Sequence, residues 1–294
     1  MKRLLCVNLI ILSLCTVFSG CNTKSEKVNI AVTTRPVWEF ATRITSGTDL
    51  TVKLLISEPV SCLHDYSLNV DQVRTAENAD VVILSGAGLE SSMISIFDAK
   101  QIIDCSAGIS FLGCDDAHDH KDHHDDHSHD IDPHIWLSPN NAKQMAVTIC
   151  QSLTQRYPQH KAEFQANLNN LIDDLNALEN YGHQQLSGLP SRNMITFHDG
   201  FAYFAQDFDC TILRAVEEES GSEASAAVLK ELIMLVERYR LPAVFTEENG
   251  STSAARIIAL ECNIPIYTLD MALSERSYFE AMYHNIDTVK EALK

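Results

Sequence analysis

The sequence lacks the two short motifs that most directly indicate a thiolate metal site or a zinc protease. Its nine cysteines include no Cys-x-x-Cys pair, which argues against a thiolate-held metal and against a redox pair. No His-Glu-x-x-His sequence occurs either, and that motif places two zinc ligands and a general base on one helix. These two absences leave histidines and carboxylates as the main candidate metal ligands in this chain.

Basic residues are also scarce. The chain has 22 Lys and Arg against 40 Asp and Glu, which gives a formal net charge of −18. A protein with this excess of negative charge should avoid nucleic acid and anionic surfaces. The apolar run that ends at Phe18 is too short, and wrongly flanked, for a stable membrane-spanning helix.

The first 20 residues are typical of a secretory signal peptide. Lys2 and Arg3 precede the apolar run, and small residues in "FSGC" stand directly before Cys21. This arrangement resembles a bacterial lipoprotein box and predicts cleavage after residue 20, a lipid on Cys21 and a tether to the outer side of a membrane. An ordinary cleaved signal peptide is the alternative, because Phe18 is not the commonest residue at its position. Both interpretations take the protein out of the cytoplasm.

Cys6 and Cys15 lie in the predicted signal peptide, and Cys21 would carry the lipid. The other six cysteines would lie in a compartment that permits disulfides. They are Cys62, Cys105, Cys114, Cys150, Cys210 and Cys262. The sequence leaves their pairing open, and buried free thiols are the alternative for most of them.

Strands and helices alternate along the chain and predict an α/β fold with mainly parallel sheets. The expected strands are short apolar, β-branched runs at 28–34, 50–56, 79–86, 101–106, 193–199, 210–217, 242–248 and 264–270. Between the two sets of four strands, apolar residues recur every three or four positions from Phe164 to Tyr181, which predicts one long amphipathic helix ending near Gly182. The pattern therefore predicts two α/β lobes, 28–158 and 191–294, joined by a spine helix within 159–188.

Three histidines outside the acidic segment follow strands or lie in strand-to-loop contexts: His64, His134 and His198. The strand 264–270 ends in Asp270. Because ligands of open α/β sheets bind beyond the carboxyl ends of strands, three imidazoles and one carboxylate meeting there would form a site suited to Zn²⁺. The histidines on helical stretches are expected to have no ligand role; they are His160, His183 and His284.

Residues 115–130 read "DDAHDHKDHHDDHSHD" and cannot form a packed core. We expect a disordered surface loop over 115–132 that binds zinc weakly at many His and Asp groupings, as an accessory collector or sensor of zinc. A solubilising acidic loop is the alternative. The candidate accessory ligands are His118, His120, His123, His124, His127 and His129.

The mature chain resembles the substrate-binding lipoproteins of bacterial zinc ABC importers, within the TroA-like metal-binding proteins. The motifs that carry the resemblance are "HDYSLNVDQV" (64–73), "ADVVILSGAGLES" (79–91), "DPHIWLSPNNA" (132–142), "TFHDGFAYFAQDF" (196–208), "AVFTEENGS" (243–251) and "IYTLD" (266–270). The resemblance implies two lobes bridged by a long helix, with the metal in the cleft between them. It implies His64, His134, His198 and Asp270 as the metal ligands, and Glu247 as a carboxylate that supports the site without binding the metal. This chain departs from the family around the first histidine, where Cys62 stands two residues before His64 and leaves a thiolate contact open.

The resemblance further implies a monomeric binding protein, and not an enzyme, that captures Zn²⁺ and passes it to an ABC permease with a cytoplasmic ATPase. Manganese and iron relatives would carry a carboxylate where this chain has His198, and a nitrogen ligand there favours Zn²⁺. Two alternatives stay open: a binding protein for manganese or nickel, and an exported zinc hydrolase.

Overall fold

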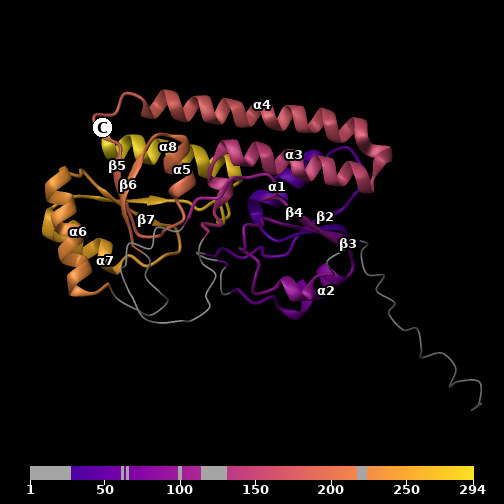
Figure 1. Cartoon of the computed structure of the whole chain (residues 1–294), viewed down its shortest axis with the longest axis horizontal. Helices are drawn as coiled ribbons and strands as arrows, with labels where there is room; N and C mark the ends of the chain where they lie inside the picture. Colours follow the sequence, from indigo (N-terminus) through magenta and orange to yellow (C-terminus); the bar gives the residue numbers. More distant parts are fainter. Residues whose placement is uncertain (1–27, 61–62, 64–65, 99–100, 114–130, 217–223) are drawn as a thin grey trace, which may run out of the picture.

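Two four-stranded parallel sheets form the centres of two lobes (Figure 1). The computed structural model describes residues 28–60, 63, 66–98, 101–113, 131–216 and 224–294. The strands of the first sheet are β1 (Val28–Val32), β2 (Val52–Leu54), β3 (Ala79–Leu84) and β4 (Ile102–Asp104), in the order β2-β1-β3-β4. The second sheet has the order β6-β5-β7-β8 and consists of β5 (Asn193–Thr196), β6 (Thr211–Ala215), β7 (Val244–Glu247) and β8 (Ile266–Leu269). All eight predicted strands and the predicted α/β class are confirmed.

The sheets are covered by helices, as parallel sheets require. The helices are α1 (Arg35–Ile44), α2 (Val70–Glu77), α3 (Pro139–Arg156), α4 (Lys161–Leu186), α5 (Ala202–Asp207), α6 (Ala226–Tyr239), α7 (Ser253–Cys262) and α8 (Tyr278–Leu293). Short 3-10 turns occur at η1 (Ile94–Ile96), η3 (Ile135–Leu137) and η4 (Pro158–His160). Among the described helices, none is both long and apolar enough to cross a lipid bilayer.

Helix α4 is the predicted spine. It runs along both lobes, with α1 and α3 packed along one part of its length and α8 along the other (Figure 1). Its apolar stripe is buried as the sequence period predicts, but the helix continues beyond Gly182 to Leu186. Gly182 does not end the helix, because it lies where the Phe208 ring packs: a Cβ there would stand 2.1 Å from Phe208 Cε1. The missing side chain is a packing requirement and not a stop signal.

One hydrophobic core continues from the first lobe through α3, α4 and α8 into the second lobe, where Phe204, Phe245 and Leu269 belong to it. A smaller core lies between the second sheet and helices α6 and α7. Because protein interiors are close-packed, a core shared by the two lobes resists their displacement relative to each other. The residue limits expected for the two lobes stay predictions.

Several predicted features lie outside the described residues. These are the signal peptide 1–20, the lipidation site Cys21, Cys62, His64, Cys114 and the accessory histidines His118, His120, His123, His124, His127 and His129. The described cysteines Cys105, Cys150, Cys210 and Cys262 are free thiols.

Candidate metal centre

His134 is held by the residues that immediately precede it. It caps the short turn η3, and Asp132 lies two positions earlier across Pro133. One carboxylate oxygen of Asp132 accepts hydrogen bonds from both the backbone N–H of His134 (2.9 Å) and its ring Nδ1 (2.8 Å). A carboxylate on Nδ1 fixes the ring orientation and leaves Nε2 as the metal-binding nitrogen. Both side chains are almost fully buried.

Hydrogen bonds from the second lobe fix the segment that carries His134. The Tyr203 hydroxyl donates to the Asp132 carbonyl at 3.0 Å, and the Trp136 indole N–H donates to the Met271 carbonyl at 2.8 Å. The Tyr278 hydroxyl donates to the Trp136 carbonyl at 3.0 Å. These buried bonds join chain segments that are far apart in the sequence, so the position of His134 relative to the second lobe is well defined.

His198 lies two residues after the end of the central strand β5 of the second sheet. The strand pairing continues one residue beyond β5, since Phe197 N–H donates to the Phe245 carbonyl of β7 at 2.8 Å. This places the buried His198 side chain at the carboxyl edge of the sheet. Glu247, the last residue of β7, brings Oε2 to 3.6 Å from His198 Nδ1. The role of Glu247 as a supporting carboxylate stays a prediction, and this distance is compatible with it.

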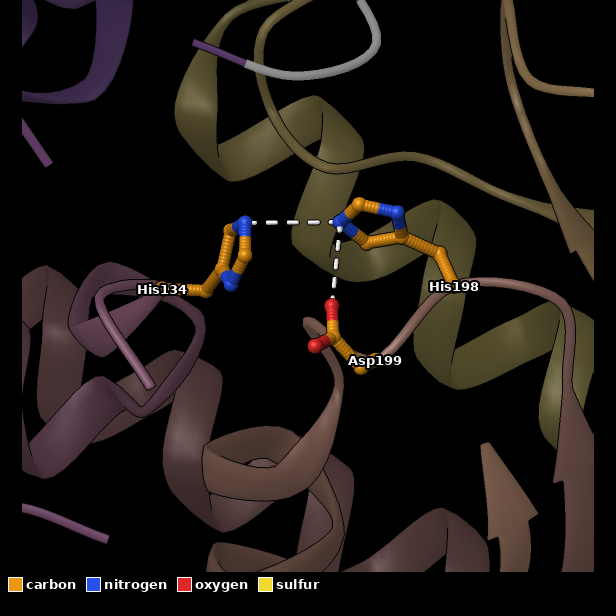
Figure 2. Close-up of side chains that lie close together, drawn as sticks. All are labelled: His134, His198 and Asp199. Carbon is orange, nitrogen blue, oxygen red and sulfur yellow. Dashed lines mark hydrogen bonds and ion pairs between the residues drawn. The ribbon is translucent and has the colours of Figure 1, made fainter. Parts of the chain in front are cut away.

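The two histidines present the same ring nitrogen to each other (Figure 2). Their Nε2 atoms lie 3.4 Å apart, and Asp199 Oδ1 lies 3.7 Å from His198 Nε2. Among the described residues, the metal-ligand atoms of His134, His198 and Asp199 lie within 4.8 Å of one another. Two imidazole nitrogens bound to one tetrahedral zinc, each about 2.0–2.1 Å from the ion, would stand about 3.3 Å apart. The observed spacing therefore fits a tetrahedral ion with nitrogen ligands.

Gly200 makes this close approach possible. A Cβ at Gly200 would lie 2.9 Å from His134 Cγ, 2.9 Å from His198 Cδ2 and 2.4 Å from Met271 Cε. The two rings thus pack over a backbone with no side chain. A side chain is therefore sterically excluded at Gly200, which follows the "HD" of the motif at 196–208.

Asp270 follows β8, as the sequence predicts, and is buried. It is not one of the three side chains whose ligand atoms come together in the described part of the chain. Its carboxylate instead accepts hydrogen bonds from Ala272 N–H, the Ser274 hydroxyl and Arg276. The ligand roles of His64, His134, His198 and Asp270 stay predictions.

The three histidines expected to have no ligand role have other contacts. His160 pairs with Asp49 at 2.9 Å, His183 lies edge-on to Phe208, and His284 Nε2 lies 3.2 Å from the Thr268 carbonyl. Sequence reasoning missed Asp132, Asp199 and Gly200. The Asp-Pro-His triplet at 132–134 could have indicated the first, because an Asp two residues before a histidine can bond that residue's backbone.

A buried carboxyl group lies at the carboxyl ends of β1 and β3 in the first lobe. Glu90 accepts hydrogen bonds from the Thr33 hydroxyl (2.6 Å), Ser85 N–H (2.8 Å) and Gly86 N–H (3.1 Å). Despite these donors, burial raises the pKa of Glu90 to about 7. The group anchors the loop that leaves β3.

The fold and the site together define a class: a two-lobed α/β binding protein whose candidate ligands come from both lobes. The chain belongs to the family described as the periplasmic zinc-uptake complex component A (ZnuA), whose model matches residues 30–292. This confirms the family that the motifs predicted.

Individual relatives agree with the assignment. The chain is 28% identical over 307 residues to the zinc-binding lipoprotein AdcA of Streptococcus pneumoniae, covering 97% of this chain and 60% of that protein. It therefore spans about 60% of the length of that relative. A putative metal-binding protein of Treponema pallidum is 27% identical over 282 residues, covering 92% of this chain and 88% of that protein.

Solved structures show the same fold. A crystal structure of ZnuA superposes with a TM-score of 0.77 at 28% identity, covering 92% of this chain and 100% of that one. A zinc-bound ZnuA deletion mutant superposes with a TM-score of 0.76 at 27% identity, covering 92% of this chain and 99% of that one.

Proposed function

We propose that this protein binds Zn²⁺ outside the cytoplasm and delivers it to an ABC-type permease for uptake. The observation that carries the proposal is the pair of Nε2 atoms of His134 and His198, which face each other at 3.4 Å. Each ring has a carboxylate near its Nδ1, from Asp132 and Glu247 respectively. Support also comes from the relatives whose names state zinc binding and from the zinc-bound ZnuA structure.

Imidazole ligands favour zinc over manganese. In the proposed site, His134, His198 and His64 supply nitrogen and Asp270 supplies oxygen. Imidazole suits Zn²⁺, whereas Mn²⁺ is better served by carboxylate, carbonyl and water oxygens. Asp132 accepts a hydrogen bond from Nδ1 of His134 at 2.8 Å, and Glu247 Oε2 lies 3.6 Å from Nδ1 of His198. The Nε2 atoms of both rings therefore point towards the same volume. A dication in that volume satisfies both lone pairs, and this is the binding function of the site.

The remaining parts of the proposal concern the chain around the site. The protein acts as a monomer, is held to the membrane by a lipid on Cys21, and transfers its ion to a permease driven by a cytoplasmic ATPase. The 115–130 segment collects zinc at low affinity and raises the local ion concentration near the tight site. The protein as a whole performs no catalysis.

Isothermal titration with Zn²⁺ tests the proposal on the chain from residue 22 to 294. One tight site and several weaker ones are expected, with the tight site lost in His134→Ala and in His198→Ala. His284→Ala is the matched control. It removes a histidine of the second lobe whose Nε2 lies 3.2 Å from the backbone carbonyl of Thr268 and which is not part of the histidine pair. Deleting 115–130 should remove weak sites alone. A wild-type protein without a tight zinc site, or tighter binding of Mn²⁺ at equal free ion, would contradict the proposal.

A further inference from the structure

The carboxylate of Asp270 accepts three hydrogen bonds from donors of its own loop. Oδ1 accepts a hydrogen bond from Ala272 N–H at 2.7 Å, and Oδ2 accepts from the Ser274 hydroxyl at 2.6 Å and from Arg276 Nη1 at 2.9 Å. Only 1% of the Asp270 side chain is exposed, whereas 39% of the Arg276 side chain is exposed. The buried carboxylate of Asp270 is thus paired with the guanidinium of Arg276, which lies on the solvent side.

The backbone of Asp270 is fixed independently of this pair. Asn285 of α8 accepts from Asp270 N–H and donates to the Asp270 carbonyl, both at 2.7 Å, and is itself fully buried. The next residue, Met271, reaches Gly200, where the rings of His134 and His198 also meet. Asp270 is therefore next in the chain to a residue whose side chain reaches the backbone under the histidine pair. Because its backbone is held by Asn285, a change of partner by Asp270 would occur through its side-chain torsions.

Arg276 has a second anionic partner. Its Nη1 also bonds the carboxylate of Glu248, which directly follows Glu247. Glu248 is itself tied to β8, since its N–H donates to the Leu269 carbonyl at 2.9 Å. The hydrogen bonds to Glu248 and Asp270 raise the pKa of Arg276, so the guanidinium is charged throughout the physiological range. If Asp270 turned away, Arg276 would still be paired.

We propose that Arg276 competes with the metal for Asp270, so that metal binding exchanges one cation for another on the same buried carboxylate. The inference rests on the proposed function, because it takes the divalent cation bound by the two histidines as the competitor. On entry, the ion meets His134, His198 and the more exposed Asp199, and Asp270 then turns from Arg276 to the ion. On release, Arg276 returns, and the buried carboxylate is not left without a counter-charge.

The exchange has a direct energetic reason. A carboxylate that is buried without a partner costs far more free energy than one that is paired, so the Arg276 contact stabilises the metal-free state. Part of this stabilisation must be given up when the metal binds. Because the arginine is partly exposed, the pair is screened by solvent and its contribution is modest. Removing the guanidinium should therefore tighten zinc binding by roughly threefold to tenfold, mainly through slower release.

The test compares zinc affinity and the rate of zinc release to a chelator in wild type, Arg276→Gln and Arg256→Gln. Arg256 is an exposed arginine of the same lobe, on α7, so its substitution removes the same charge without touching Asp270. We expect Arg276→Gln to bind zinc more tightly and release it more slowly than either other protein. Weaker or unchanged binding in Arg276→Gln, with wild type binding tightly, would overturn the inference and leave the proposed function intact.

A double-variant cycle separates competition from a general effect on folding. In Asp270→Asn the carboxylate charge is gone, so adding Arg276→Gln should leave zinc affinity unchanged. An equal effect of Arg276→Gln in both backgrounds would contradict the exchange, and so would an Asp270→Asn variant that binds zinc as tightly as wild type.

NMR of the arginine side chains provides a readout on the unaltered protein. The Nη protons of Arg276 should exchange faster with solvent once zinc is bound, and unchanged protection of these protons would refute the proposal. If wild type shows no tight site at all, the proposed function fails instead.

Discussion

Replacing Gly200 with alanine should push the two site histidines apart. The new Cβ would stand 2.9 Å from a ring carbon of each histidine, whereas carbon atoms in favourable contact are about 3.5–4.0 Å apart. The third close neighbour, Met271 Cε at 2.4 Å, is the end of a flexible side chain and can move aside. The rings cannot move as easily, because Asp132 holds both the ring Nδ1 and the backbone N–H of His134, and His198 follows a buried strand.

The expected magnitude follows from these contacts. Inserting a methyl group into a packed site costs about 1–3 kcal/mol of folding stability. The Nε2 atoms have to shift by roughly half an ångström or more, while zinc ligand distances tolerate about 0.2 Å. We therefore expect zinc affinity to fall by about tenfold to a hundredfold, the range seen when groups supporting a metal ligand are removed.

Gly188→Ala is the control for this change. A Cβ at Gly188 would meet nothing within 4 Å, so the same substitution there adds no contact near the site. Zinc titration and thermal unfolding of wild type, Gly200→Ala and Gly188→Ala measure affinity and stability together. If Gly200→Ala binds zinc as tightly as Gly188→Ala, the histidine spacing is not set by Gly200 and the steric argument is wrong.

Three further predictions concern the site, the buried acid and ligand-linked stability. Asp132→Asn should weaken zinc binding by about tenfold to a hundredfold, because the His134 ring loses its anionic partner; unaltered affinity by titration would contradict this. Burial raises the pKa of Glu90 from 4.5 to about 7, so the folded state keeps a proton that the unfolded state loses. Stability linked to Glu90 is therefore full below pH 4.5 and is lost, by about 3 kcal/mol, as the pH rises through 7. Urea unfolding of the metal-free protein at pH 5 and pH 8 should show a smaller difference in Glu90→Gln, and an identical difference would refute the assignment. Free zinc at a hundred times its dissociation constant should add about 2.7 kcal/mol of stability. The melting temperature should then rise by about 5–10 °C, and no rise in calorimetry would count against a tight site.

The central strands β1, β3, β5 and β7 were predictable because nearly all of their residues are buried. Val28–Val32 is entirely buried in the centre of the first sheet, and such a strand leaves a continuous apolar run in the sequence. The long helix was predictable because Phe164, Leu168 and Leu171 recur at helical spacing and all face the core. The end of that helix was not predictable, because a glycine such as Gly182 is also typical of a helix C-terminus. Its contact with Phe208 depends on packing that a local pattern does not contain.

The site was predictable only in part. His134 and His198 stand out because each accompanies the carboxyl end of a strand or a proline-bounded loop, where α/β proteins bind ligands. Their spacing depends on Gly200 and on hydrogen bonds between the lobes, such as that from Trp136 to Met271, and sequence periodicity does not encode contacts over such separations. The pairing of Asp270 with Arg276 is similarly hidden, since it arises from an irregular loop with no repeating pattern.

A crystal structure of the zinc-loaded protein, with anomalous diffraction recorded on both sides of the zinc absorption edge, tests the central claim most directly. We expect one strong zinc peak between His134 and His198, about 2.0–2.1 Å from the Nε2 atom of each. Zinc bound elsewhere, with these two nitrogens still facing each other without an ion between them, would contradict the account.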